Sequence, residues 1–305
     1  MSMRVLRALG LGAAALTLSV TSGPAALAAT PAEAPAPAQA RAAASESYYL
    51  SLGDSLSTGY QPGLGDTDEG YADRLHQVLK AFRPGLKLVK LGCTGETANT
   101  FVNGGKCAYG DADSQLDAAV DFLRAHPGKV SYVTLNIGAN DINACVRPNG
   151  VDTTCLTSAM QGVAANLTRI TQTLKEAGAA GTVTPRYVGM GTFDPLLAAW
   201  LRGPAGQEQA RQSVQLVAGF NALESGVYRK AGFGVVDADR LWHTADFTHT
   251  VTLRDFGTVP VNVGLVCSLT TMCTKGDLHP TPAGYAYIAA AFAVEIATGR
   301  ESAEG

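Results

Sequence analysis

The chain has 305 residues, of which 46% are hydrophobic and 16% are charged, and its formal net charge at pH 7 is −3. This length is enough for one domain with a full hydrophobic core. The mildly acidic balance, with no stripe of Lys and Arg, argues against a nucleic acid as partner.

The first 28 residues have the pattern of a secretory signal peptide. Arg4 and Arg7 form a basic start, residues 8–20 are apolar and uncharged, and Ala26-Leu27-Ala28 fits a small-x-small cleavage site. We therefore expect a secreted, extracellular protein with no stable membrane insertion after cleavage. The alternative is an uncleaved anchor, but the apolar run is shorter than the ~20 residues that a membrane span needs.

Residues 29–44 are rich in Ala and Pro and have almost no large apolar side chains. Such a segment cannot bury a core, so we expect a flexible leader. Residues 45–305 contain no internal repeat and no second linker, and we expect them to form a single domain.

Strand-like and helix-like segments alternate along this domain. Apolar or alternating patterns predict five strands, at 48–52, 86–91, 130–137, 182–190 and 233–236. Amphipathic and capped patterns predict five helices, at 71–82, 114–126, 157–177, 207–230 and 282–298. Residues 237–275 show neither pattern and predict a long irregular stretch.

This alternation predicts an α/β fold with a parallel sheet covered by helices on both faces. Five strands favour a three-layer α/β/α sandwich with the flavodoxin-like order 2-1-3-4-5, in which ligands bind at the carboxyl ends of the strands. Ser55, Gly95, Asn140 and Asp194 each follow the carboxyl end of a predicted strand. His279 precedes the last helix, so we expect it at the same edge of the sheet.

The motif Gly53-Asp54-Ser55-Leu56 directly follows the first predicted strand. A serine at a strand-to-helix turn can act as a nucleophile, with its hydroxyl and its own N–H both facing the substrate. The alternative is that Ser55 only caps a helix, with Asp54 interacting with the helix dipole.

Two further turns follow the next two strands. Gly95, in the Gly-rich segment 91–97, can offer a backbone N–H to an oxyanion, or can simply serve a turn that needs positive φ. Asn140, in Gly138-Ala139-Asn140-Asp141, can donate its amide to the same oxygen, or can cap a helix through an Asx turn.

One of the five histidines has the surroundings of a catalytic base. His279 stands in Asp277-Leu278-His279-Pro280, where it has a neighbouring acid, a rigid proline and a helix that follows. We expect the other four to be solvated on predicted helices (His76, His126) or to lie in the irregular stretch, where they can line a cleft (His243, His249).

Six cysteines stand at positions 93, 107, 145, 155, 267 and 273. An even number in an exported chain favours disulfides, and six cysteines allow 15 pairings. Joining neighbours along the chain gives the simplest set, Cys93–Cys107, Cys145–Cys155 and Cys267–Cys273. Because no Cys-x-x-Cys occurs and the histidines are scattered away from the cysteines, we expect no metal site.

Four blocks, in this order, resemble the SGNH/GDSL hydrolase family: Ser55 in Gly-Asp-Ser-Leu, Gly95 in Gly-Glu-Thr, Asn140 in Gly-Ala-Asn-Asp, and His279 in Asp-Leu-His-Pro. The resemblance runs from about residue 48 to 296 and is greatest to the secreted bacterial esterase/lipase branch with three disulfides. It implies a three-layer α/β fold and hydrolysis of acyl esters without metal or cofactor. It also implies that Ser55 is the nucleophile, that His279 is the base, and that Ser55, Gly95 and Asn140 form the oxyanion hole.

One position departs from the family pattern. The usual acid stands three residues before the histidine, where this chain has Gly276. Asp277, two residues before His279, is therefore the expected acid, and a dyad in which a backbone carbonyl orients His279 is the alternative. Asp194 is a reserve candidate.

We expect a monomer that hydrolyses a small-molecule or lipid ester. Five apolar side chains that can form an acyl pocket favour this substrate: Tyr60, Phe193, Leu196, Leu197 and Trp200. The last three can equally be core residues on a helix face. One alternative function is a carbohydrate (acetyl) esterase, and another is a non-catalytic surface-binding domain, against which the four intact blocks argue.

Overall fold

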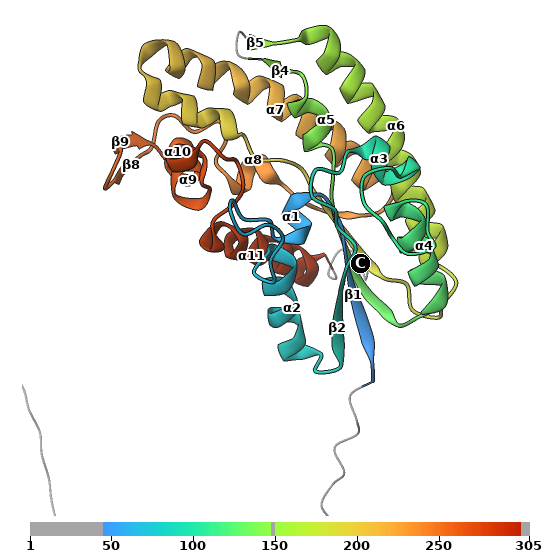
Figure 1. Ribbon diagram of the computed structural model, residues 1–305. Helices are drawn as coiled ribbons and strands as arrows, with labels where there is room; N and C mark the ends of the chain where they lie inside the picture. The colour runs from blue at the N-terminus through green and yellow to red at the C-terminus, as the bar shows by residue number, and fades with distance from the viewer. Residues whose placement is uncertain (1–44, 148–149, 300–305) are drawn as a thin grey trace, which may run out of the picture. The chain divides into compact units, whose positions relative to one another are not determined.

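The computed structural model is built on a five-stranded parallel sheet with the order β2-β1-β3-β6-β7 (Figure 1). The structure describes residues 45–147 and 150–299, so the expected signal peptide and leader lie outside the described residues. The predicted order 2-1-3-4-5 and the α/β/α class are confirmed by the five strands, β1 (Ser47–Gly53), β2 (Leu86–Lys90), β3 (Val130–Asn136), β6 (Arg186–Met190) and β7 (Gly234–Val236).

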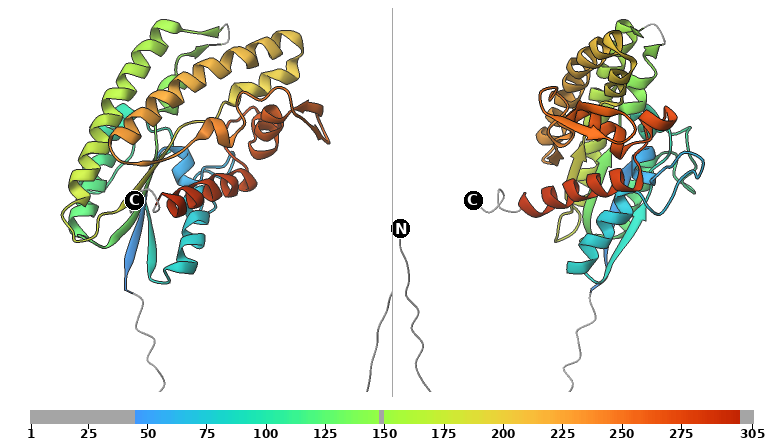
Figure 2. Two further views of the ribbon diagram at one scale, coloured as in Figure 1. Left: turned by 180° about the vertical axis from the view of Figure 1, so that it is seen from behind. Right: turned by 90° about the vertical axis from the view of Figure 1, so that its left-hand side faces the viewer.

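Helices cover both faces of this sheet, as the left view of Figure 2 shows. One face is covered by α3 (Ala98–Asn103), α4 (Gln115–Ala125), α6 (Thr153–Gly178) and α7 (Pro204–Lys230). The other face is covered by α2 (Tyr71–Phe82) and α11 (Pro282–Thr298), and α9 (Val261–Leu269) packs against α11. The predicted bounds of α2 and α11 are correct, because an amphipathic face defines the first and Pro282 at its start defines the second.

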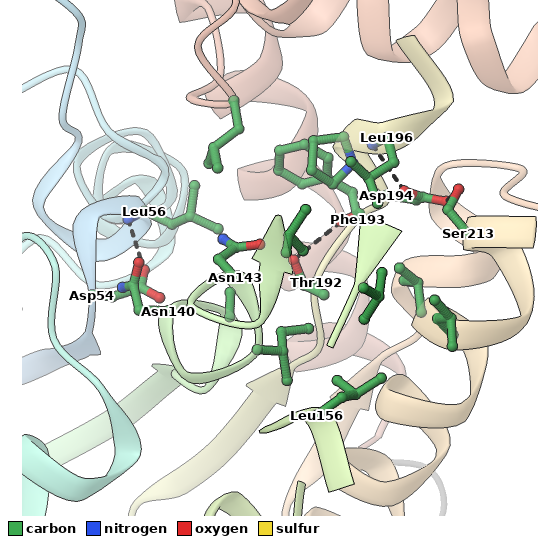
Figure 3. Close-up of a pocket in the computed structure, with 18 residues that line it drawn as sticks. Asp54, Leu56, Asn140, Asn143, Leu156, Thr192, Phe193, Asp194, Leu196 and Ser213 are labelled. Carbon is green, nitrogen blue, oxygen red and sulfur yellow. Dashed lines mark hydrogen bonds between the residues drawn. The ribbon is translucent and has the colours of Figure 1, made fainter. Parts of the chain in front are cut away.

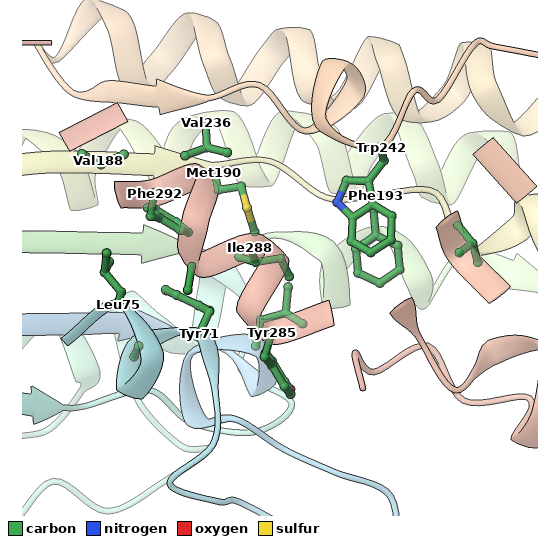
Figure 4. Packing of buried hydrophobic residues seen from close by; sticks show 14 of the residues in the cluster. Tyr71, Leu75, Val188, Met190, Phe193, Val236, Trp242, Tyr285, Ile288 and Phe292 are labelled. Carbon is green, nitrogen blue, oxygen red and sulfur yellow. The ribbon is translucent and has the colours of Figure 1, made fainter. Parts of the chain in front are cut away.

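Successive residues of β1 point to opposite faces of the sheet and enter different cores. Tyr49 belongs to the core on the α2 and α11 side, whereas Leu50 and Leu52 belong to the core on the α4 and α6 side. Figure 4 shows the first core, in which Tyr71 of α2 stacks on Phe292 of α11 with ring centroids 4.8 Å apart. Both sides of the sheet are therefore buried, as a parallel sheet requires.

The fourth strand of the sheet is shorter than predicted. We expected it to begin at residue 182, but β6 begins at Arg186. Pro185 has no N–H to give to a ladder hydrogen bond, so regular pairing with β3 starts only after it.

The prediction of a long irregular stretch at residues 237–275 is wrong. Most of this segment is ordered as α8 (Ala238–Leu241), the antiparallel pair β8 (Thr250–Leu253) and β9 (Gly257–Pro260), α9, and α10 (Met272–Lys275). Helix α9 is apolar on nearly every side, so it shows no helical periodicity in the sequence, and Val263 and Val266 are fully buried in the core beside α11.

Short elements surround the carboxyl edge of the sheet. They are α1 (Ser55–Thr58), α5 (Ala139–Asn143), the pair β4 (Val146–Arg147) and β5 (Gly150–Val151), and the 3₁₀ helix η1 (Pro195–Arg202). Ser55 begins α1, Asn140 lies within α5, and Asp194 caps η1, so three of the candidate residues belong to these short elements. Among the described residues, no helix is long and apolar enough to span a membrane.

Candidate active site

Ser55 is the first residue of α1, immediately beyond the carboxyl end of β1. The residue that caps this helix is Asp54, whose Oδ1 accepts a hydrogen bond from the Leu56 N–H at 3.0 Å. The alternative of Ser55 as the helix cap is therefore wrong, and its hydroxyl is left to make other contacts. The Ser55 N–H, like that of Gly95, donates to no acceptor in the described part of the chain.

The turn before Ser55 requires a glycine. Gly53 has φ of 131°, and a Cβ atom built on it would lie 2.0 Å from the backbone oxygen of Asn136 at the end of β3. This close approach lets the Asn136 oxygen accept from the Asp54 N–H at 3.3 Å, while Asn136 Nδ2 donates to Asp54 Oδ1 at 2.9 Å. The ends of β1 and β3 thus fix the direction in which Ser55 leaves the sheet.

His279 and Asp277 form a continuous hydrogen-bonded chain with Ser55. His279 Nε2 lies 2.9 Å from Ser55 Oγ, and His279 Nδ1 lies 2.8 Å from Asp277 Oδ1. The same Asp277 oxygen accepts from the His279 backbone N–H at 2.9 Å. Two residues are therefore enough spacing for the carboxylate to fold back onto the imidazole, although the family pattern places the acid three residues away.

The ionisation of Asp277 suits this arrangement. Burial acts to raise its pKa, but hydrogen bonds from the backbone and ring of His279 and from Thr271 outweigh burial, and the net pKa is lowered. Asp277 is therefore a carboxylate at neutral pH, able to accept from Nδ1. The ring of Tyr60 lies against the imidazole, with centroids 4.4 Å apart, and limits its rotation.

The loops after β2 and β3 come together beside Ser55. Asn140 Nδ2 donates to the backbone oxygen of Glu96 at 2.8 Å, which leaves its second amide proton free for a ligand. Asp141 Oδ2 accepts from the Ala98 N–H at 2.8 Å and ties the same two loops together. Gly95 has φ of 80°, so its turn does need a glycine. The structure thus brings together the two loops that carry Gly95 and Asn140, the predicted oxyanion residues other than Ser55.

Asn140 is not the helix cap that the alternative proposed. Gly138 occupies the N-cap position of α5, with φ of 120°, and Asn140 lies within the helix. Its side chain is therefore free of a local capping role and points to the loop that carries Gly95.

Three disulfides join cysteines that are neighbours along the chain, Cys93–Cys107, Cys145–Cys155 and Cys267–Cys273. This is the simplest pairing expected from the sequence. The first begins two residues before Gly95, the second follows α5, and the third encloses Thr271, which contacts Asp277. Each disulfide therefore braces a different loop of the candidate site.

An apolar pocket opens next to these groups (Figure 3). Asp54, Leu56 and Asn140 lie at one end of it, and Phe193, Leu196 and Ser213 lie at the other. Its volume is about 70 Å³, several times the volume needed to hold one water molecule. The remaining walls come from the disulfide loop and neighbouring helices and include Ile142, Val146, Val151, Leu156, Leu216 and Leu278.

The predicted acyl pocket is only partly correct. Phe193 and Leu196 line the pocket, whereas Leu197 is fully buried in the core. Trp200 stacks on Phe247, with ring centroids 5.2 Å apart, and does not line the pocket. The physical reason is the 3₁₀ geometry of η1, in which residues three apart share a face, so that Leu197 and Trp200 turn together towards the core.

Asp194, the reserve acid, has a different role. Its Oδ1 caps η1 through the Leu196 N–H at 2.9 Å, and its Oδ2 accepts from the Ser213 hydroxyl at 2.6 Å. Burial raises its pKa to about 6. His279 Nδ1 is already held by Asp277, so Asp194 forms part of the pocket wall and not of the Ser55–His279 chain.

The other histidines lie apart from this chain. His76 and His126 are half-buried, each with a ring nitrogen 2.9 Å from a backbone oxygen, so the expectation of solvated side chains is wrong. His249 is exposed and pairs with Asp246 at 2.8 Å. Neither His243 nor His249 lines the pocket beside Ser55.

One buried acid near the site was not recognised from the sequence. Glu224 of α7 is 1% exposed, and its Oε2 has no hydrogen-bond partner among the described residues. Together with Asp54 and Thr192 it lines a second cavity of about 10 Å³, which has room for at most one water. A glutamate within an amphipathic helix is expected on the surface, so the sequence pattern did not indicate that Glu224 is buried.

This arrangement brings a hydroxyl, an imidazole and a carboxylate into one hydrogen-bonded chain at the carboxyl edge of a parallel sheet, as in serine hydrolases. Residues 51–287 match the model of the GDSL-like lipase/acylhydrolase family. The chain therefore belongs to this family, whose members hydrolyse esters. No curated protein matches the chain.

Solved structures show the same fold at low sequence identity. The lipase Lip_vut3 from a goat rumen metagenome is 14% identical, with a TM-score of 0.54, and the match covers 82% of this chain and 97% of the lipase. Protein YxiM from Bacillus subtilis is 16% identical, with a TM-score of 0.53. That match covers 85% of this chain but only 57% of YxiM.

The buried acid Glu224 predicts a specific dependence of stability on pH. Burial, and then the nearby Asp54 and Asp141, raise the pKa of Glu224 well above its ordinary value of 4.5. The unfolded chain therefore loses this proton at a lower pH than the folded protein does, and the free energy of unfolding falls by up to about 1.4 kcal/mol per pH unit as the pH rises above the unfolded-state pKa. Because Glu224→Gln cannot ionise, its Tm minus that of the wild type should increase between about pH 5 and pH 8.

The control is Glu208→Gln, an exposed position on the same helix. Its Tm difference from the wild type should stay constant over the same pH range. A constant difference for Glu224→Gln as well would show that Glu224 does not titrate with a raised pKa.

Proposed function

We propose that this protein is a serine esterase or lipase that hydrolyses carboxylic acyl esters through Ser55, His279 and Asp277. The observation that carries the proposal is the unbroken hydrogen-bonded chain from Ser55 Oγ through both ring nitrogens of His279 to Asp277. Family membership supports ester hydrolysis in general, and this chain supplies the residues for it.

The chemistry follows from the positions of these atoms. His279 Nε2 takes the proton of the Ser55 hydroxyl as Oγ attacks the ester carbonyl carbon. Asp277 holds Nδ1–H and stabilises the imidazolium that forms. The proton then passes from Nε2 to the leaving alcohol, and an acyl-enzyme remains on Ser55. A water molecule, activated by His279 in the same way, releases the acid.

The negative charge that develops on the carbonyl oxygen needs donors that are already in place. The free N–H groups of Ser55 and Gly95 and the second amide proton of Asn140 can supply them. Asn140 cannot turn away easily, because its other amide proton is bound to the Glu96 oxygen. Removing one such donor typically lowers turnover by ~10²–10³.

The first test of this mechanism compares Ser55→Ala, His279→Ala and Asp277→Asn with the wild type on p-nitrophenyl butyrate. The first two variants should lose measurable turnover, because the attacking and proton-accepting atoms are gone. Asp277→Asn should lower kcat by about 10³–10⁴, since the amide favours the wrong tautomer of His279. Near-wild-type activity of Asp277→Asn with loss in His279→Ala would instead favour a dyad.

The chain offers a matched control for this experiment. Asp246 and His249 form a hydrogen-bonded acid–imidazole pair of the same kind, at 2.8 Å, but His249 is exposed and has no contact with Ser55. Asp246→Asn and His249→Ala should keep wild-type turnover. A large loss in these variants would mean that the assay responds to general damage.

The walls of the pocket favour a longer acyl chain over an acetyl group. Leu56, Ile142 and Phe193 offer apolar surface next to Asn140, and burial of each additional methylene contributes about 0.8 kcal/mol. We therefore infer that esters of lipids or other simple acids are preferred over acetylated sugars.

The chain-length preference can be tested with p-nitrophenyl esters of increasing acyl length. The kcat/KM of the wild type should rise by up to about fourfold per methylene beyond acetate until the pocket is full. Val151→Phe should fill the pocket and remove this rise, whereas Val183→Phe, at an exposed site away from the pocket, should keep it. Faster hydrolysis of acetylated sugars than of any longer ester would favour the carbohydrate esterase alternative.

We also infer that the protein is secreted and acts outside the cell. The support is the signal-like pattern of residues 1–28 together with three disulfides, which persist in oxidising compartments. The protein recovered from the culture medium should begin at Ala29 by N-terminal sequencing. Retention in the cell with Met1 intact would contradict the inference.

A further inference from the structure

Thr271 lies at the turn between α9 and α10, inside the loop closed by Cys267 and Cys273. It faces the segment that carries the acid and the base of the candidate site. Its N–H donates to the backbone oxygen of His279 at 3.0 Å. Its hydroxyl lies 2.9 Å from the backbone oxygen of Asp277, its nearest acceptor, and 3.4 Å from both Asp277 Oδ1 and the backbone oxygen of His279.

These contacts are made to an acid that lies unusually close in sequence to the histidine. Asp277 stands only two residues before His279, so its carboxylate has to fold back to reach Nδ1, and one oxygen accepts from both Nδ1 and the His279 N–H. The side chain of Asp277 is 32% exposed, so water competes for that carboxylate. A hydroxyl that holds the backbone of Asp277 from the other side restricts how far the carboxylate can swing away.

We propose that Thr271 is a positioning residue that keeps the carboxylate of Asp277 on Nδ1 of His279. This inference rests on the proposed function of Ser55, His279 and Asp277. Thr271 does not line the pocket, and its hydroxyl acts on the site through Asp277, whereas its backbone N–H, which holds the His279 oxygen, is unchanged when the side chain is replaced. The turn that carries Thr271 is held by the isolated β-bridge between Thr270 and Pro280 and by the third disulfide.

Loss of the hydroxyl should reduce the fraction of molecules in which the acid and base are aligned. Thr271→Val keeps the shape of the side chain and removes the donor, and we expect kcat to fall about tenfold with KM within about twofold of the wild type. Thr271→Ser restores the hydroxyl and should return kcat to within about threefold of the wild type. Thr271→Ala provides a second variant without the hydroxyl if the valine disturbs folding.

A purely structural role for Thr271 would also lower activity, so the decisive measurement is a double-mutant cycle with Asp277→Asn. If Thr271 acts through the acid, then Thr271→Val should cause no further loss of kcat in the Asp277→Asn background. An equal loss in both backgrounds would overturn the proposal and assign Thr271 to loop stability alone.

The neighbouring Thr270 supplies the matched control. Its hydroxyl donates to the backbone oxygen of Val266 at 2.7 Å and has no contact with Asp277 or His279. Thr270→Val should keep kcat near the wild-type value, even if it lowers Tm. If Asp277→Asn lowers kcat but Thr271→Val and Thr271→Ala do not, only the positioning role fails; if Asp277→Asn itself has no effect, the proposed triad and the positioning role fail together.

Discussion

The candidate site depends on one backbone contact, where β1 and β3 end side by side. Gly53 approaches the Asn136 oxygen so closely that no side chain fits between them. The Gly53 oxygen also accepts from the Cys93 N–H at 3.0 Å, which brings in the loop of Gly95. Because β3 leads directly into α5, the same contact places Asn140. This single approach of two backbones therefore determines where Ser55, Gly95 and Asn140 lie.

This contact is held by buried polar groups, which are costly to desolvate unless they are paired. Tyr71 of α2 donates to Asn136 Oδ1 at 2.8 Å, and Asn136 donates in turn to Asp54. Burial raises the pKa of Asp54 to about 7 even though Asn136 and the Leu56 N–H lower it. The protein thus places a chain of hydrogen bonds, instead of apolar packing, between its core and the turn that carries Ser55, and gains a fixed direction for that turn.

The sequence predicted the sheet and the positions of Ser55 and His279 at its carboxyl edge because both leave local signals. Neighbouring residues alone show the alternation of strand-like and helix-like segments and the proline that begins α11. They also show the motifs that contain Ser55 and His279. The errors arose where structure depends on distant contacts. Helix α9 has no periodicity because it is buried on nearly all sides, and the orientation of Trp200 follows from a 3₁₀ turn that the residue pattern does not distinguish from an α-helix. Thr271 matters only because the chain brings it back against Asp277, and such pairings are not visible in the order of residues.

The paired cysteines are 14, 10 and 6 positions apart in the sequence. None of the three disulfides joins one loop of the site to another. Each loop is therefore closed at its own base, and the loop between Cys145 and Cys155 contains no described residue that hydrogen-bonds to Ser55, His279 or Asp277. The loop closed by Cys145 and Cys155 begins after Asn140, so residues can be inserted or exchanged in the pocket wall while Asn140 keeps its place. Closure entropy grows only slowly with loop length, so such changes cost little stability. In evolution or in design, the substrate range of this scaffold can change one loop at a time while its chemistry is inherited unaltered.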